Sequence, residues 1–378
     1  MKIRWLQLKG ARDIELAMKN LDVDGTGINI MAGKAQFLII KIEGIKGFWA
    51  NILKQEMLSV GGEVALPRDV ITGKIKSADC FVFATLSQYA KLVEKLKRQP
   101  WGMNEAGQKI KEAIDNLSKN RWKVGTGKAR LNIGYKTLIM GILNVTPDSF
   151  SENGKFYREK DAINRALMME QEGADIIDIG GESTRPGAKL VPVKEELKRI
   201  LPVIKILSRK LKVPISVDTR KSEVAKAVLG EGALLINDVS GFNSDPRMKE
   251  VVAHYRIPAV VMHMKGNPRT MQKNPSYKSL FSEMIDYFNR NINMLVAAGV
   301  SEENIIIDPG IGFGKTINHN IEILKNLGEL KILGRPILVG TSRKSFIGKL
   351  LDADIGNRLF GTVASSCLAM LNGADILR

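Results

Sequence analysis

Charged and amide side chains follow several short apolar runs along the chain, and their types suit one kind of ligand. A carboxylate can accept two N–H groups from a guanidine-like ring edge, while lysine and arginine donate charge-assisted hydrogen bonds to ring oxygen or phosphate. Each residue alone could instead cap a helix or shape a turn. Together they predict a site for a hydrogen-bonding heterocycle with an anionic tail. The set comprises Asp218, Asn237 and Asp308 with the cations Arg185, Lys344 and Arg378.

Oxygen-bearing side chains accompany this set. Asn144 ends the first apolar run, and Ser183 and Thr184 follow the second. Amide and hydroxyl groups can seat phosphate oxygens or a Mg²⁺ ion, which prefers oxygen ligands. We therefore expect these residues to lie beside the anionic part of the ligand.

The sequence lacks the residue patterns of several other kinds of active site. Gly310–Lys315 looks like part of a phosphate-binding P-loop, but Pro309 stands where the first glycine belongs, and the run also fails the G-x-G-x-x-G pattern. The three histidines lack zinc-ligand spacing, and His263 could either line the pocket or pack in the barrel. No serine-hydrolase elbow or Cys/His nucleophile pair appears. The sequence thus disfavours a Walker NTPase, a Rossmann dehydrogenase and a zinc enzyme.

The elements that must position these residues form a repeating pattern. From residue 137 onward, eight short apolar, β-branched runs each end in polar residues, with helical patterns between them. This rhythm predicts a (β/α)8 TIM barrel, whose functional residues gather at the carboxyl ends of its strands; a doubly wound sheet is the alternative. The expected strands are 138–145, 175–180, 214–218, 234–239, 259–264, 305–309, 336–341 and 374–377.

The first third of the chain has a different texture. Expected strands at 3–8, 36–43 and 80–86 alternate with helical patterns at 48–58, 87–98 and 105–119, which predicts a smaller α/β or α+β domain. A polar, glycine-bearing stretch at 119–128 reads as a connector. We therefore expect an N-terminal domain over 1–128, of unassigned role, and a barrel over 129–378.

Composition limits the partners. The 378 residues include 57 Lys+Arg and 40 Asp+Glu, a formal charge of +17, with the excess concentrated in residues 1–130. No nucleic-acid-binding motif accompanies this charge, so a basic nucleic-acid-binding protein is a remote alternative. Cys80 and Cys367 are far apart, which fits a reducing cytoplasm, and no apolar stretch is long enough to span a membrane. We expect a cytoplasmic protein that binds small molecules.

Five segments of the second domain carry a specific signature: GILNVTPDSFS, IGGESTRPGA, SVDTRK with LINDVSG, DPGIGFGK and VGTSRKSFIG. In this order and spacing they resemble the dihydropteroate synthase family of pterin-binding barrels. The resemblance implies condensation of 6-hydroxymethyl-7,8-dihydropterin diphosphate with 4-aminobenzoate, giving 7,8-dihydropteroate and diphosphate in folate biosynthesis. It also implies an SN1-like substitution assisted by Mg²⁺, sensitivity to sulfonamides, and a homodimer.

The resemblance assigns roles to individual residues. Asn144, Arg185, Asp218, Lys344 and Arg378 would be catalytic, and Asn144 would lie beside Mg²⁺. The pterin would contact Asp218, Asn237, Met262, Asp308, Lys344 and Arg378. The diphosphate and 4-aminobenzoate would contact Asn144, Thr184, Arg185, Pro186, Phe313, Lys344, Ser345 and Arg378.

The family pattern continues beyond strand eight with Val-His-Asp and a last helix, whereas this sequence stops at Arg378, so the barrel looks cut short there. Two related activities stay open. A methyltetrahydrofolate:corrinoid methyltransferase shares the fold, although the STRPG and SRKS segments argue against it. Against the other, a synthase that uses a modified, ribosylated aminobenzene for a methanopterin-type cofactor, the sequence offers less.

Overall fold

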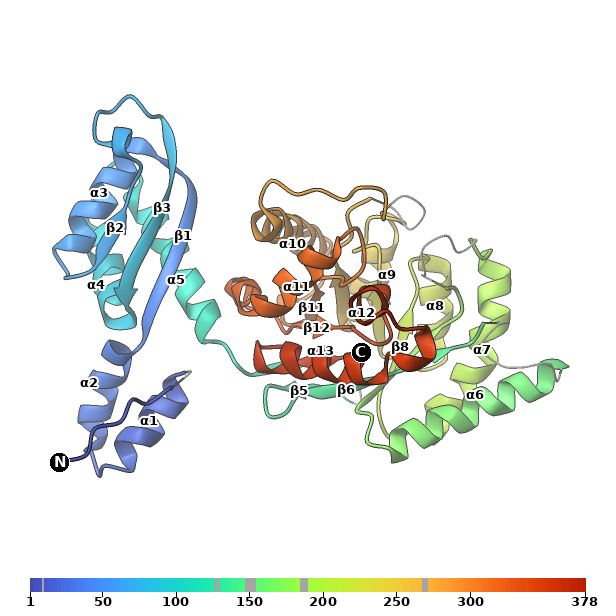
Figure 1. Cartoon of the computed structure of the whole chain (residues 1–378). Coiled ribbons are helices and arrows are strands. Elements are labelled where there is room, and N and C mark those ends of the chain that lie inside the picture. Colours follow the sequence, from blue (N-terminus) through green and yellow to red (C-terminus); the bar gives the residue numbers. More distant parts are fainter. Residues whose placement is uncertain (9, 126, 128–129, 147–153, 184–189, 267–270) are drawn as a thin grey trace. The chain divides into compact units, whose positions relative to one another are not determined.

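The computed structural model describes residues 1–8, 10–125, 127, 130–146, 154–183, 190–266 and 271–378. The chain forms two compact units, Met1–Asp115 and Asn116–Arg378 (Figure 1). This division falls before the boundary predicted at 128/129, because part of the predicted connector folds as a strand of the second unit. Within the described residues, no helix is both long and apolar enough to cross a membrane.

The N-terminal unit is built on an antiparallel sheet. In the described chain this sheet has three strands in the order β1 (Phe37–Lys46), β3 (Ser77–Thr85) and β2 (Glu63–Ala65). Its core includes Leu53 and Tyr89, both fully buried. The helices are α1 (Ala11–Lys19), α2 (Gly25–Ala35), α3 (Gly47–Leu58), α4 (Leu86–Leu96) and α5 (Met103–Ser118), the last of which continues into the second unit. The prediction of a smaller α/β or α+β domain is therefore confirmed.

One expected strand is absent from this unit. Residues 3–8 form no regular structure, and the side chains of Ile3 and Trp5 are exposed. The sequence of residues 3–8 has the alternation of apolar residues that is typical of a strand. In the described sheet, however, β1 pairs with β3, and residues 3–8 pair with neither strand. Alternation alone does not make a strand, which needs a hydrogen-bonded partner.

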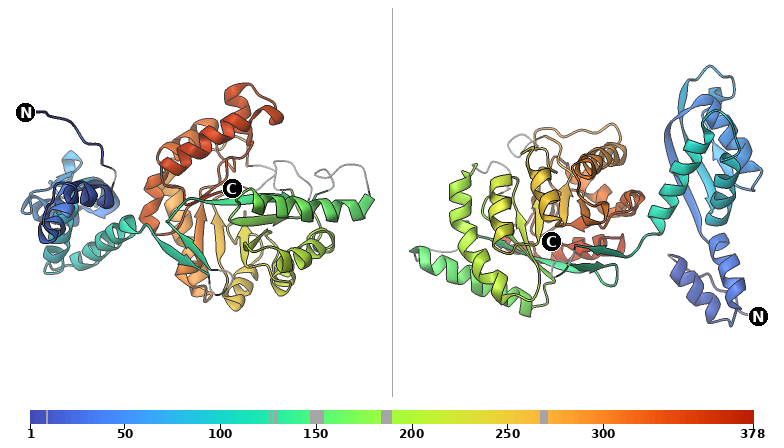
Figure 2. Two further views of the ribbon diagram at one scale, coloured as in Figure 1. Left: turned by 90° about the horizontal axis from the view of Figure 1, so that it is seen from below. Right: turned by 180° about the vertical axis from the view of Figure 1, so that it is seen from behind.

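The second unit is a parallel barrel surrounded by helices (Figures 1 and 2). Its eight described strands follow the order β11-β10-β9-β8-β7-β6-β13-β12, and a parallel bridge between Ile307 and Ile337 joins the two ends of the sheet. The TIM-barrel prediction is confirmed. The strands are β6 (Leu138–Asn144), β7 (Ile176–Gly180), β8 (Ile215–Asp218), β9 (Leu235–Asp238), β10 (Ala259–Met262), β11 (Ile305–Asp308), β12 (Leu338–Val339) and β13 (Ile376–Leu377).

The helices of this unit pack outside the strands. Each residue of β7 to β11 is buried, which explains why these strands read as continuous apolar runs rather than as alternating ones. The helices are α6 (Gly154–Gln171), α7 (Val193–Lys210), α8 (Ser222–Gly230), α9 (Met248–Tyr255), α10 (Leu280–Ala297), α11 (Ile317–Lys325), α12 (Ser345–Leu351) and α13 (Leu359–Leu371).

A hairpin covers the amino-terminal end of the barrel interior. It consists of β4 (Trp122–Val124) and β5 (Leu131–Ile133), which are antiparallel. Val124 and Ile133 are fully buried in one cluster with strand residues such as Leu138 and Ile306. Apolar side chains of the hairpin therefore fill the amino-terminal end of the barrel interior. The polar residues lie at the opposite, carboxyl end of the strands.

Candidate functional site

The carboxyl ends of neighbouring strands bring the predicted residues into two rows. Strand register places Asn144 of β6 beside Gly180, Gly180 beside Asp218, and Asp218 beside Asn237 of β9. On the other side of the mouth, Met262 of β10 pairs with Asp308 of β11. Parallel strands end at the same edge, so residues far apart in sequence share one site.

Arg378 forms ion pairs with two carboxylates at the barrel mouth. Its Nη2 atom donates to Asp218 Oδ2 at 2.7 Å, and its Nε atom donates to Asp178 Oδ2 at 2.6 Å. Asn237 Nδ2 donates to the same Asp178 oxygen at 3.1 Å. A fully buried carboxylate thus orients both a cation and an amide of the site.

Asp178 was not among the predicted residues. The sequence did contain a signal, because it is an isolated acid inside the buried run IIDIG, where an unpaired charge would be costly. Within the described chain, Asp178 Oδ1 and Asn237 Oδ1 are buried without a hydrogen-bond partner. Two such acceptors at the barrel mouth suit N–H donors on a ligand.

Burial tunes the charges of the site. It raises the pKa of Asp218 to about 7, although the Arg378 guanidinium acts in the opposite direction. Burial also raises the pKa of Asp308, with Lys344 opposing the shift. The paired carboxylates Asp178 and Asp218 raise the pKa of Arg378 despite its burial, so this guanidinium stays charged.

Asp308 is followed by a glycine-rich loop. Its Oδ1 atom accepts a hydrogen bond from the backbone N–H of Gly310 at 2.7 Å. Gly310 has φ +65°, and a Cβ atom there would lie 2.1 Å from the carbonyl oxygen of His263. Only glycine fits this close approach, so the path of the loop beside Asp308 requires glycine at this position.

Lys344 and Phe313 lie together close to Asp308. The Lys344 ammonium lies 4.7 Å from the centre of the Phe313 ring and donates to the carbonyl oxygen of Ile311. Burial lowers the pKa of Lys344 to about 8, while Asp308 raises it. Ser345 follows as the first, exposed residue of α12. This side presents a flat ring, a cation and a hydroxyl group.

His263 proves to be a packed histidine. Its Nδ1 atom lies 2.8 Å from Lys315 Nζ, and its ring packs edge-on against Tyr287 at 4.8 Å. Burial, followed by the charge of Lys315, lowers the pKa of His263. Lys315 is itself only 3% exposed, and it also donates to the carbonyl oxygens of His263 and Phe313. These hydrogen bonds connect the loop after Asp308 to the residue that follows β10.

The second strand-end segment is only partly described. Thr184, Arg185 and Pro186 lie outside the described residues, so the structure does not test them. Glu182 precedes them, accepting hydrogen bonds from Arg220 at 2.8 Å and Lys221 at 2.5 Å. These ion pairs hold the start of the segment against the beginning of α8.

No cluster of three or more His, Cys, Asp or Glu side chains that could hold a metal occurs in the described chain. Asn144 is exposed at the end of β6. A Cβ atom at Gly180 would lie 3.7 Å from Asn144 Oδ1 and 3.6 Å from the Asp218 Cβ atom. A single amide oxygen in this position fits a Mg²⁺ ion whose other ligands come from water and phosphate.

The comparisons with known proteins decide the family. The model of the pterin binding enzyme family matches residues 140–378. Dihydropteroate synthase of Synechocystis is 49% identical over 253 residues, which cover 67% of this chain and 88% of that protein. The chain belongs to the dihydropteroate synthase family.

The solved structures agree with this membership. The structure of dihydropteroate synthase from Clostridium difficile, obtained with pteroic acid, has 47% sequence identity and a TM-score of 0.62, covering 66% of this chain and 92% of that one. The expected motif segments of the dihydropteroate synthase family all lie within residues 140–378. Membership favours the synthase over the corrinoid methyltransferase alternative.

A longer relative also matches the N-terminal unit. A probable bifunctional folylpolyglutamate synthase/dihydropteroate synthase of Halobacterium salinarum is 40% identical over 377 residues, covering 98% of this chain. The chain spans 44% of the length of that relative. The N-terminal unit is therefore shared with another member of the dihydropteroate synthase family.

Proposed function

We propose that the chain condenses 6-hydroxymethyl-7,8-dihydropterin diphosphate with 4-aminobenzoate to give 7,8-dihydropteroate and diphosphate. The observation that carries this proposal is the set of buried acceptors facing cations at one barrel mouth: Asp218, Asn237 and Asp308 opposite Lys344 and Arg378. This is the donor and acceptor pattern that a pterin ring with an anionic leaving group requires.

The pterin ring uses the deep end of the site. The carboxylates of Asp218 and Asp308 accept its N–H groups, and the unpaired Asn237 Oδ1 takes a further one. Lys344 donates to a ring oxygen or nitrogen, while Met262 packs against the ring from the end of β10. Because these acceptors are buried, a ligand lacking matching donors would leave them unsatisfied, which costs about 1–3 kcal/mol for each group.

The reaction breaks the bond between the pterin methylene carbon and the diphosphate oxygen, and that oxygen keeps the electron pair. The dihydropterin ring delocalises the positive charge left on the methylene. The amine nitrogen of 4-aminobenzoate then bonds to this carbon and releases one proton. No protein nucleophile is needed, so the protein acts by stabilising charge and orienting the amine.

The leaving group lies toward Asn144 and Arg378 in this proposal, with Thr184 and Arg185 also assigned to it by the family pattern. Asn144 would supply a protein oxygen ligand to Mg²⁺ beside the diphosphate. When bound, Mg²⁺ offsets the negative charge that develops on the leaving oxygen. The 4-aminobenzoate ring lies against Phe313, Lys344 and Ser345, with Pro186 as its further predicted contact.

The test combines binding with turnover. Asp308→Ala should weaken binding of the pterin diphosphate in calorimetry by about 100-fold, ~3 kcal/mol, because a buried charge-assisted acceptor is lost. Asp286→Ala, an exposed acid on α10, is the matched control and should leave binding unchanged. A coupled assay then follows diphosphate release with 4-aminobenzoate. Unaltered pterin affinity in Asp308→Ala, or no diphosphate release by the wild type, would refute the proposal.

A further inference from the structure

The lysine that ends the P-loop-like run is buried, and the proposed reaction gives it no role. The Lys315 side chain is 3% exposed. Its ammonium donates to the carbonyl oxygen of Phe313 at 3.0 Å and to that of His263 at 3.3 Å, and it lies 2.8 Å from His263 Nδ1. These partners are two carbonyl groups and an imidazole rather than a carboxylate. An apolar side chain would avoid the desolvation of this ammonium, so its hydrogen bonds point to a function.

His263 gives Lys315 a fixed support. A lysine ammonium has only donors, so His263 Nδ1 must accept its hydrogen bond. Burial lowers the pKa of His263, which keeps the ring neutral and able to accept. The backbone N–H of His263 donates to the carbonyl oxygen of Asp308 in β11 at 2.8 Å. Lys315 therefore reaches the glycine-rich loop from a residue that is itself tied to the barrel strands.

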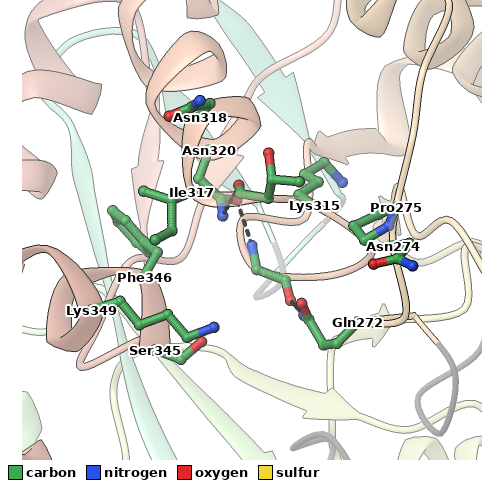
Figure 3. Close-up of a pocket in the computed structure, with 12 residues that line it drawn as sticks. Gln272, Asn274, Pro275, Lys315, Ile317, Asn318, Asn320, Ser345, Phe346 and Lys349 are labelled. Atoms are coloured by element: carbon green, nitrogen blue, oxygen red, sulfur yellow. Dashed lines mark hydrogen bonds between the residues drawn. The ribbon is translucent and has the colours of Figure 1, made fainter.

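The glycine-rich loop is also held by side chains on both sides of Phe313. The backbone N–H of Gly312 donates to Asn320 Oδ1 at 2.8 Å, a hydrogen bond made by the labelled Asn320 of Figure 3. The hydroxyl group of Tyr277 donates to the carbonyl oxygen of Gly314 at 2.8 Å. Helix α11 and the stretch before α10 thus fix the two glycines, and the peptide group between them is left to Lys315.

The direction of the Phe313 ring depends on that peptide group. The Phe313 N–H donates to the carbonyl oxygen of Gly310 at 3.0 Å, and its carbonyl oxygen accepts from Lys315. Gly312 and Gly314 on either side have φ +81° and +66°. Glycine is conformationally permissive, so these neighbours restrain Phe313 little on their own. The ammonium of Lys315 supplies a restraint that the chain itself does not.

The pterin end of the site has a separate support. Asp308 belongs to β11, where it pairs with Met262 of β10. Strand pairing of this kind does not depend on the ammonium of Lys315. Loss of Lys315 should therefore displace Phe313, against which the second substrate lies, and leave Asp308, which the pterin contacts, in place.

We propose that Lys315 is a positioning residue for the second substrate, because it fixes the ring of Phe313 through the Phe313 carbonyl group. The inference rests on the proposed condensation and deepens it by separating the support of the two substrates. In this proposal Lys315 contacts neither substrate. Its effect belongs to the KM for 4-aminobenzoate, whereas a merely structural residue would weaken the binding of both substrates alike.

Lys315→Met tests this separation, since methionine keeps the apolar bulk of the side chain but has no donor. We expect the KM for 4-aminobenzoate to rise about 10-fold while the Kd of the pterin diphosphate in calorimetry stays within about 2-fold. Leu324→Ala, a buried position of α11, is the matched control for lost stability and should leave both constants unchanged. An unchanged KM in Lys315→Met, or a parallel rise of both constants, would overturn the proposal.

Lys315→Ala adds a chemical rescue and replaces Lys315→Met if that protein does not fold. Lys315 lines a cavity of about 430 Å³, through which a small amine can reach the vacated position (Figure 3). The cation n-propylammonium has the size of the atoms that are lost. It should lower the raised KM by about 3-fold or more, whereas neutral n-propanol should have little effect. Equal effects of the two compounds would contradict the role of the ammonium.

A measurement without turnover keeps this proposal distinct from the condensation. Absence of turnover by the wild type would count against the condensation itself. The position of Phe313 is then followed by ¹⁹F NMR of protein labelled with 4-fluorophenylalanine, with Phe313→Leu identifying its resonance. That resonance should shift or broaden in Lys315→Met and stay in place in Leu324→Ala. An unaltered resonance in Lys315→Met would refute the positioning role.

Discussion

Arg378 lies between two carboxylates, and this arrangement gives Asp178 a larger role than its position inside a strand suggests. Asp178 is fully buried and accepts hydrogen bonds from both Arg378 and Asn237. It has no need to touch the ligand in order to matter. By fixing the guanidinium and the amide, it presents both groups to the barrel mouth in one geometry.

Asp178→Asn tests this positioning role. The substitution keeps the shape of the side chain but removes its charge, so Arg378 loses one of its two ionic partners and Asn237 is free to turn. We expect kcat/KM for the pterin diphosphate to fall by about 10- to 100-fold while the protein stays folded by circular dichroism. Normal kinetics in a folded Asp178→Asn protein would contradict this role.

The charges of the site predict a pH optimum. Asp218, with a pKa of about 7, loses its acceptor carboxylate as the pH falls, and Lys344, with a pKa of about 8, loses its ammonium as the pH rises. A plot of kcat/KM against pH should therefore decline on both sides of a maximum between these values. Lys344→Arg, whose guanidinium keeps its charge, should lose only the alkaline decline. A flat profile between about pH 6 and about pH 9 would contradict the assignment.

At the residue scale, the strand-end residues could be predicted because a parallel barrel brings its carboxyl ends together whatever their separation in sequence. Asp218, Asn237 and Asp308 needed only the strand pattern to be placed together. Asp178 was missed because it lies within its strand, where sequence position alone does not say which face of a doubly buried strand points inward. The packing of His263 depends on Lys315, far away in sequence, and so stayed open.

Among the elements, the hairpin β4–β5 is hard to predict from its sequence, although its side chains pack into the barrel interior. Its strands are three residues long, and the sequence between them is polar and contains glycine, which predicts a connector. It is stabilised by contacts made only after the barrel exists: Trp122 Nε1 donates to the carbonyl oxygen of Gly334 at 3.0 Å, and Gly125 N donates to Asn304 Oδ1 at 2.9 Å. Long-range packing of this kind leaves no local pattern.

Ile133→Ala measures how much the hairpin stabilises the barrel. Ile133 is fully buried at the amino-terminal end of the barrel interior, and removing three of its carbons should leave a cavity. We expect the free energy of unfolding to fall by about 2–4 kcal/mol in urea titration. Asn132→Ala, at the exposed position next to it in β5, should change that free energy by less than about 0.5 kcal/mol. Similar effects of the two substitutions would contradict the packing.

For the whole molecule, the two units have separate cores, and the family match covers only the second. The relative from Synechocystis corresponds to 67% of this chain and is nevertheless a dihydropteroate synthase. The proposed reaction is therefore assigned to residues of the second unit. The basic N-terminal unit, predicted as α/β or α+β, contributes none of the residues assigned to the reaction.

Two truncations test this division. A chain that begins at residue 116 keeps the whole second unit, including the hairpin, and its kcat/KM should stay within about 2-fold of the full chain, because the barrel packing is unchanged. A chain that begins at residue 135 loses the hairpin and exposes Leu138 and Met140. Loss of its buried side chains should cost roughly 5 kcal/mol, enough to prevent stable folding. Equal activity of both truncated proteins would show that the hairpin is dispensable.

Arg378 directly follows β13, which lies between β6 and β12 in the barrel. β13 has two residues, and the backbone N–H of Arg378 donates to the carbonyl oxygen of Val339 in β12 at 3.0 Å. Arg378 thus takes part both in the proposed site and in the backbone contact with β12. A ligand at 100 times its Kd adds about 2.7 kcal/mol to the stability of a folded protein. Here that stabilisation should appear first as slower hydrogen exchange at residues 376–378, so a bound substrate should reduce how often this strand end opens.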